Sequence, residues 1–115
     1  MKFSVEIISD GGATGSFVYG KTSTLRAEDV EHYIGELCKA IGARYEDEHE
    51  DDDGYEWTGA HGSIYYETDE DKFHLIQVDF DDTADMLAVM QIACVMCSEG
   101  CVATYYDCDG KEIDG

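Results

Sequence analysis

The chain lacks proline altogether and has few basic residues. Its 115 residues include no Pro and only seven Lys and Arg, against 27 Asp and Glu. The absence of Pro argues against long linkers and disordered tails, where Pro is usually abundant. The scarcity of Lys and Arg excludes a cationic groove that would bind nucleic acid directly. No apolar run approaches the length of a membrane span, and an anionic membrane surface would repel the chain, so no membrane partner is expected.

An export signal is also missing. The first eight residues contain Glu6 and no apolar stretch of signal-peptide length. The five cysteines are an odd number. Together these features predict free thiols and a cytoplasmic location.

What the chain has in excess is negative charge, with a formal net charge of −20 on 12.8 kDa. Like charges repel in a compact state, so this imbalance does not serve stability. The apolar fraction is nevertheless 43%, with eight Tyr, four Phe and one Trp. Disordered acidic chains lack aromatic residues, so the composition predicts one folded domain over residues 1–115.

Periodicity predicts an α+β domain in the order β-β-α-β-β-α-β, a mostly antiparallel sheet with two helices packed on one face. Strands are expected at residues 2–9, 16–20, 55–67, 72–80 and 102–106. One helix is expected over residues 27–42, and a second from a cap at Asp82 or Thr83 to Ser98. Asp109 and Gly110 resemble a type I′ turn into a short C-terminal strand.

The two helices differ in pattern. The first has one apolar stripe, formed by Val30, Ile34, Leu37, Cys38 and Ile41. The second is apolar nearly all round, so it is expected to be buried against the sheet. Residues 46–53 hold seven acids in eight positions, which predicts a solvated loop or mobile segment.

Residues 15–22 match the P-loop pattern G-x-x-x-x-G-K-[ST] letter for letter. The intervening Phe17, Val18 and Tyr19 prefer extended backbone. A phosphate-binding loop needs its backbone wrapped around an anion, and this acidic chain repels anions. A hairpin strand is therefore the favoured interpretation of the segment.

No cofactor, metal site or catalytic residue is predicted. Cys94, Cys97, Cys101 and Cys108 supply four thiols, but the first pair falls within an apolar helical run, where small buried cysteines are common. Acid-rich segments ending at Gly54 and Gly110 do not complete a calcium loop. The four histidines show no ligand spacing, and no nucleophile lies in a recognisable triad context. The chain is therefore not expected to be an enzyme.

The candidate functional residues are carboxylates gathered in patches, which would meet the basic site of a partner. The predicted partner-binding residues are Glu46, Asp47, Glu48, Glu50, Asp51, Asp52, Asp53, Asp69, Glu70, Asp71, Asp79, Asp81, Asp82 and Asp85. The aromatic residues placed among them are candidate anchors that add affinity beyond charge: Tyr45, Tyr55, Trp57, Tyr65 and Tyr66.

In charge and size the chain resembles small phage-encoded DNA mimics, which block restriction enzymes, CRISPR effectors or other DNA-binding proteins. The resemblance implies a non-catalytic inhibitor whose partner is a basic nucleic-acid-binding protein or nuclease complex. It would act in the host cytoplasm if phage-encoded. Three alternatives stay open: an immunity or antitoxin protein against a basic nuclease, a generic acidic domain of a halophile, and a small enzyme or metal protein that uses the Cys cluster or the Gly-Lys-Thr segment. A homodimer is also left open.

Overall fold

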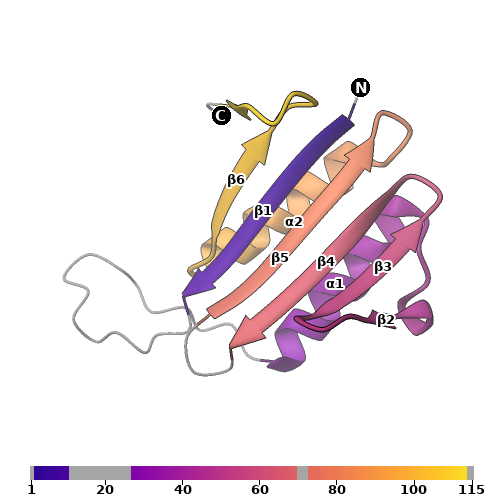
Figure 1. Ribbon diagram of the computed structural model, residues 1–115. Coiled ribbons are helices and arrows are strands. Elements are labelled where there is room, and N and C mark those ends of the chain that lie inside the picture. Colours follow the sequence, from indigo (N-terminus) through magenta and orange to yellow (C-terminus); the bar gives the residue numbers. More distant parts are fainter. Residues whose placement is uncertain (1, 11–26, 70–72, 114–115) are drawn as a thin grey trace.

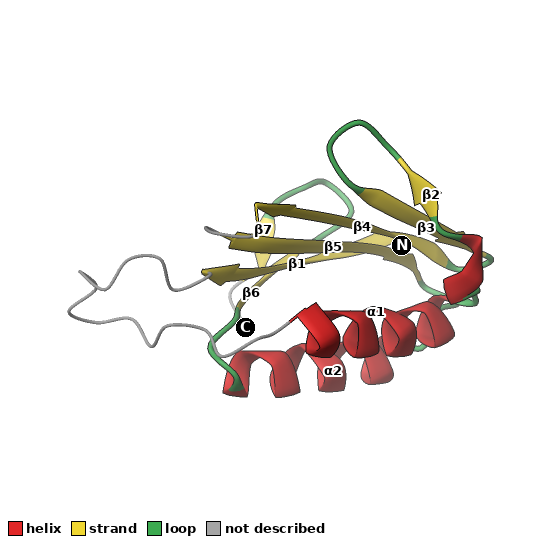
Figure 2. Cartoon of the chain, turned by 90° about the horizontal axis from the view of Figure 1, so that it is seen from below, coloured by secondary structure: helices red, strands yellow, loops and turns green. Residues whose placement is uncertain are grey.

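The computed structural model describes residues 2–10, 27–69 and 73–113, and it shows an antiparallel sheet with two helices on one face (Figures 1 and 2). The elements in chain order are β1 (Lys2–Asp10), α1 (Ala27–Ile41), the 3-10 turn η1 (Tyr45–Asp47), β2 (His49–Glu50), β3 (Tyr55–Gly59), β4 (Gly62–Asp69), β5 (Phe73–Asp81), α2 (Met86–Ser98), β6 (Val102–Tyr106) and β7 (Glu112–Ile113). This arrangement confirms the predicted α+β class.

Strand β5 lies at the centre of the sheet. The seven strands lie in the order β2-β3-β4-β5-β1-β6-β7, and every neighbouring pair is antiparallel. Strands β5 and β6 flank β1, so they are parallel to each other and are joined by α2 across the same face of the sheet. Helix α1 makes the corresponding connection from β1 to the β2–β3 edge (Figure 1).

The core lies between the sheet and the helices. Alternation along β1 and β5 points Val5, Val78 and Phe80 toward the helices, and none of the three is exposed to solvent. All five members of the stripe predicted for α1 are buried in the same cluster. The helix ends at Ile41 and is followed by Gly42, whose φ of 71° is the left-handed conformation that glycine adopts easily. Both predictions for α1 are thereby confirmed.

Helix α2 departs from its prediction. Only Val89, Ala93 and Met96 are buried in it, whereas Leu87 is 67% exposed and Val95 is 50% exposed. The reason is architectural, because a helix in a two-layer domain buries only the side that faces the sheet. Its cap is also corrected. Asp85 accepts a hydrogen bond from the Ala88 amide at 3.1 Å, so the cap is neither Asp82 nor Thr83.

Residues 55–67 do not form one strand as predicted. They form β3, a two-residue loop and most of β4. Strands β3 and β4 meet at the pair Gly59 and Gly62, with Ala60 and His61 in the loop. A Cβ on Gly59 would lie 2.4 Å from the Ile41 carbonyl oxygen, so glycine is what lets the end of α1 approach β3. Four strands therefore separate the helices, where two were predicted.

Two further predictions concern the turn before the C-terminal strand and the strand at residues 16–20. The β6–β7 connection is not a two-residue type I′ turn, because Tyr106 pairs with Glu112 and Asp109 has a negative φ. The Asp107 carboxylate holds this longer loop, accepting hydrogen bonds from the Asp109 and Lys111 amides at 2.9 and 3.0 Å. The strand predicted at residues 16–20, like the P-loop match, lies outside the described residues.

Candidate acidic interaction surface

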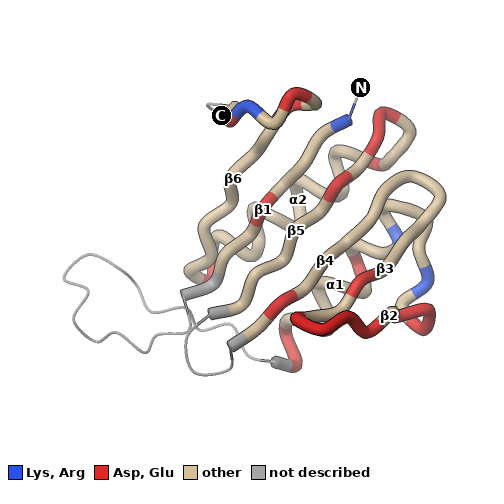
Figure 3. The backbone as a smooth tube through the Cα atoms, in the orientation of Figure 1, with Lys and Arg blue, Asp and Glu red and all other residues tan. Residues whose placement is uncertain are grey.

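The acidic run at residues 46–53 forms one edge of the sheet (Figure 3). It comprises most of η1, strand β2 and the turn into β3, and all eight side chains are exposed. Its backbone is held in place, since β2 pairs with β3 and the Asp51 amide donates to the Gly54 carbonyl at 2.8 Å. The run is thus a solvated segment, as predicted, but it includes a short edge strand.

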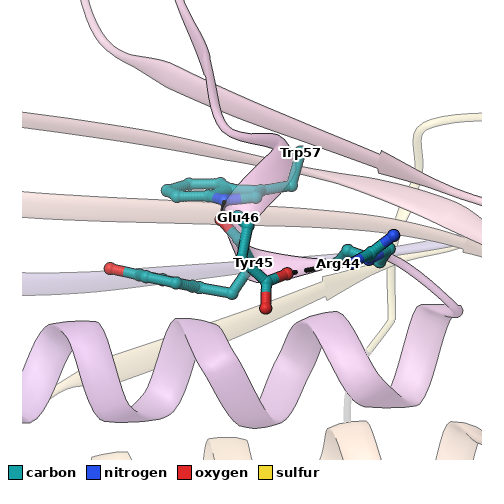
Figure 4. A network of polar contacts seen from close by, with 4 residues as sticks. All are labelled: Arg44, Tyr45, Glu46 and Trp57. Carbon is teal, nitrogen blue, oxygen red and sulfur yellow. Dashed lines mark hydrogen bonds and ion pairs between the residues drawn. The ribbon is translucent and has the colours of Figure 1, made fainter.

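Aromatic packing anchors the start of this edge to the core (Figure 4). The Trp57 indole is 2% exposed, and its Nε1 donates to the Tyr45 carbonyl at 2.9 Å. The two rings stack with centroids 5.7 Å apart. Arg44 lies 3.8 Å from Glu46, an exposed ion pair that contributes little to stability. The edge carboxylates are therefore carried on a fixed base.

The predicted acids between the end of β5 and the start of α2 divide into residues that hold the turn and residues that do not. The Asp81 carboxylate accepts hydrogen bonds from the Thr83 hydroxyl at 2.6 Å and the Thr83 amide at 3.0 Å. The hydroxyl bond is the main cause that lowers the pKa of Asp81. Asp85 caps α2. Asp82 is exposed, and Asp79 lies within β5, two residues before its end.

The patches do not gather at one end of the domain. Asp69 ends β4, and Glu70 and Asp71 fall outside the described residues. Strand β5 begins opposite Asp69 and carries Asp79 and Asp81 at its far end, so Asp69 and these two residues lie at opposite ends of the sheet.

What lies between the patches is the sheet face opposite the helices, hereafter the open face. Because Val5 and Val78 point toward the helices, the residues next to them point the other way. Four half-buried carboxylates lie within this face: Glu6, Glu56, Glu67 and Asp79. Asp81 has the same parity at the end of β5, but its carboxylate binds Thr83 in the turn. Of the four, the sequence-based set included only Asp79. The period-two alternation around Val5 and Ile7 was the signal that would have found Glu6.

The strand register keeps these four carboxylates apart. Glu6 pairs with Gln77 and Thr104, and Asp79 pairs with Ser63 and Ser4. No two acids among the described strand residues of this face stand directly opposite each other, a placement that would be destabilising. Their nearest approaches are diagonal, at about 7–8 Å between backbone positions.

The longer separations are set by the strand spacing. Glu56 and Glu6 share a row with three strand spacings between them, roughly 14 Å. The grooves of B-DNA are about 6 and 12 Å wide, so the open face spaces its charges on the scale at which nucleic acid presents phosphates.

The cysteines do not assemble a metal centre. Cys38 and Cys101 are buried, Cys94, Cys97 and Cys108 are exposed, and none of these five described cysteines forms a disulfide. Within the described residues, no group of three or more His, Cys, Asp or Glu is arranged to hold a metal ion. Burial raises the pKa of the Cys38 thiol to about 11, and the Glu46 carboxylate adds to this, so Cys38 is an unreactive core residue.

Comparisons with protein-family models, with curated proteins and with solved structures find no match to this chain. Neither described helix has the length and apolar character that a membrane crossing requires.

Proposed function

We propose that the protein is a non-catalytic inhibitor that mimics nucleic acid and occupies the basic nucleic-acid-binding site of a partner, such as a CRISPR or restriction complex of phage defence. The observation that carries the proposal is the placement of the carboxylates. They lie on the open face of an antiparallel sheet and along its β2 edge, and both are backed by a packed core.

The mechanism is competitive exclusion. Carboxylates at fixed spacings take phosphate positions in a cationic groove, while the net charge of −20 steers the encounter. The groove is then closed to DNA or RNA. A scaffold that does not rearrange on binding loses less entropy than a flexible acidic tail, which would have to order itself at that moment. The five free thiols fit a reducing cytoplasm as the place of action.

Helix α2 argues against the halophile alternative. Adaptation to salt would spread acids over the whole surface, yet the thirteen residues of α2 contain no charged side chain and leave Leu87 and Val95 exposed. The charge is therefore concentrated on other surfaces. A simple control follows: we expect the purified protein to fold fully in dilute buffer, and a requirement for molar salt would favour the halophile alternative.

The deciding experiment is affinity capture from lysate of the source organism or its host, at low and high salt, with mass spectrometry. We expect a basic nuclease or nucleic-acid-binding complex, lost at high salt because screening weakens the attraction, and displaced by added DNA or RNA. Recovery of a cognate toxin would assign the immunity role. Capture of no basic partner at either salt concentration would overturn the proposal.

Matched charge variants locate the binding surface. Reversal of two open-face acids, Glu6→Lys with Asp79→Lys, should weaken partner binding by roughly tenfold or more. The control, Glu28→Lys with Glu36→Lys, makes the same change in net charge on α1, in the other layer of the domain. Equal losses from the two pairs would mean that only net charge matters, and that the open face is not the contact surface.

A further inference from the structure

An aromatic pocket opens beside the acidic edge, between α1 and strands β3 and β4. Its volume is about 210 Å³. Its lining joins three parts of the chain: Val30, Glu31 and Ile34 from α1, Tyr45 and Glu48 from the acidic edge, and Tyr55, Trp57 and Tyr66 from the sheet. Nothing in the proposed mimicry of phosphates requires such a pocket, so its composition calls for a separate explanation.

The walls of the pocket are aromatic rings held in fixed stacks. Tyr45 stacks on Trp57, and Tyr55 stacks on Tyr66 with centroids 6.4 Å apart. Tyr66 also stacks on His74, and its hydroxyl shares a hydrogen bond of 2.7 Å with His74 Nδ1. Figure 4 shows the Tyr45 ring lying between the Trp57 indole and α1. The walls are therefore rigid, with only Tyr45 substantially exposed, at 37%.

Two carboxylates complete the lining, Glu31 and Glu48, and both side chains are exposed. Their negative potential reaches the aromatic wall: burial is the main cause that raises the pKa of Tyr45, and the Glu31 and Glu48 charges raise it further. Aromatic faces and carboxylates both attract cations, and both disfavour anions. The pocket thus selects a positive charge.

Its size decides what kind of cation fits. Pockets for drug-sized molecules and cofactors span about 300–1,000 Å³, more than this one provides. A single charged head group on an apolar stem fits its dimensions. Between the two basic side chains, arginine is favoured, because its planar guanidinium stacks on aromatic rings and binds carboxylates with several N–H donors. A lysine ammonium is more strongly hydrated and less suited to stacking.

We propose that this pocket binds the guanidinium group of an arginine side chain presented by the partner. The identity of that partner rests on the proposed function, but the affinity of the pocket for a guanidinium does not. The pocket would serve as the anchor of the interface. A partly desolvated arginine between aromatic rings is a typical hot spot, and the carboxylates along the adjoining edge would form the charged rim around it.

The test uses the protein alone, because Trp57 is the only tryptophan in the chain and lines the pocket. Its fluorescence is followed during titration with ethylguanidinium, with ethylammonium, and with ethylurea, which keeps the planar shape without the charge. Sodium chloride at equal ionic strength gives the baseline. We expect a saturable change with ethylguanidinium in roughly the millimolar range, a weaker one with ethylammonium, and none with ethylurea. No saturable change, or an equal one with ethylurea, would overturn the proposal.

Variants tie the signal to the pocket. Glu48→Gln and Tyr45→Ala should each weaken ethylguanidinium binding several-fold, whereas Tyr45→Phe, which keeps the ring, should bind like the parent. Tyr65→Ala is the matched control, since Tyr65 belongs to the same strand as Tyr66 but points to the open face. Glu48 is exposed, so its variant keeps the test valid if Tyr45→Ala fails to fold. Binding unaffected by Glu48→Gln and Tyr45→Ala would place the cation elsewhere and refute the assignment.

The outcomes separate this inference from the proposed function. If ethylguanidinium binds but no basic partner is captured from lysate, the guanidinium site is supported and the nucleic-acid mimic is refuted. A captured partner that binds the Glu48→Gln and Tyr45→Ala variants as tightly as the parent would support the nucleic-acid mimic and refute the arginine anchor.

Discussion

The two faces of the sheet have opposite physical tasks although they share the same strands. Along β5, Ile76, Val78 and Phe80 are buried beneath the helices, and the alternate positions carry Gln77 and Asp79 on the open face. A side chain's face is set by its parity in the strand. Apolar contact on one face stabilises the fold, so the other face can accumulate carboxylates without loss of the core. The comparison predicts that stability and binding respond to different substitutions in neighbouring residues.

The largest difference is expected between adjacent positions of β5. Phe80→Ala should lower the free energy of unfolding by about 3–5 kcal/mol, because Phe80 has no exposed surface and its removal leaves a cavity. Asp79→Asn, one residue away on the open face, should change it by less than about 0.5 kcal/mol. Urea unfolding of both variants measures the contrast. Similar losses for both would mean that the open face is not separate from the core energetically.

Alkaline pH should weaken the side of the sheet that the helices cover, because two groups there have raised pKa values. Burial raises the pKa of Cys38 from 9.0 to about 11, and burial, followed by a hydrogen bond to Glu99, raises that of Tyr33 from 10.0 to about 12. Both groups are neutral below their unfolded pKa values, so their contribution to stability is complete below about pH 9. It falls as the pH rises through the folded pKa values, because the unfolded chain loses these protons first.

For Cys38, which is 1% exposed, the loss is of the order of 2 kcal/mol by about pH 11. Urea unfolding measured across this pH range should show the decline, and Cys38→Val should make it shallower. Tyr33→Phe should remove the part that extends toward pH 12. A slope unchanged in both variants would assign the alkaline loss to general charge repulsion instead.

Some parts of the fold could be predicted from the sequence, and others could not. Helix α1 was predicted closely because its apolar stripe and terminal Gly42 are local signals. The β3–β4 hairpin was missed because alternation continues on both sides of the loop. The buried positions change parity there, from Trp57 to Ile64, and that change was the overlooked sign.

Part of the candidate site could likewise be predicted from the sequence, and part could not. The exposed run at residues 46–53 could be predicted from composition, since seven acids cannot be buried together. The contribution of Glu6 and Glu56 depends on which strands are neighbours, and the order of strands in the sheet is not a local property of the sequence. The aromatic pocket likewise joins α1 to β3 and β4, so the grouping of its rings emerges only from the fold.

A smaller effect is expected from removing charge on the open face. Glu6→Gln with Asp79→Asn eliminates one diagonal pair of like charges, and should raise the free energy of unfolding by roughly 0.2–1 kcal/mol at low salt. The gain should shrink as sodium chloride screens the remaining repulsion. Unfolding measured at low and high salt checks both statements. A loss of stability in the double variant would show that these acids have a structural role.

The smallest effect on stability is expected from a substitution on α2, and the same substitution should have a large effect on self-association. We expect two copies of the chain to meet through this helix if they associate, because each copy carries −20 and α2 has no charged residue. Leu87 is 67% exposed, so Leu87→Glu should change the unfolding free energy by less than about 0.5 kcal/mol while preventing self-association. Val102→Glu, at a position 64% exposed on the open face, is the matched control and should leave association intact.

Light scattering over a range of protein and salt concentrations provides the measurement. Salt should strengthen this association by screening like charges, the opposite of its effect on the complex with a basic partner. A dimer that survives Leu87→Glu would contradict the α2 contact. Because the two assemblies respond to salt with opposite signs, one salt titration distinguishes an acidic surface that attracts a partner from a neutral helix that tolerates a second copy.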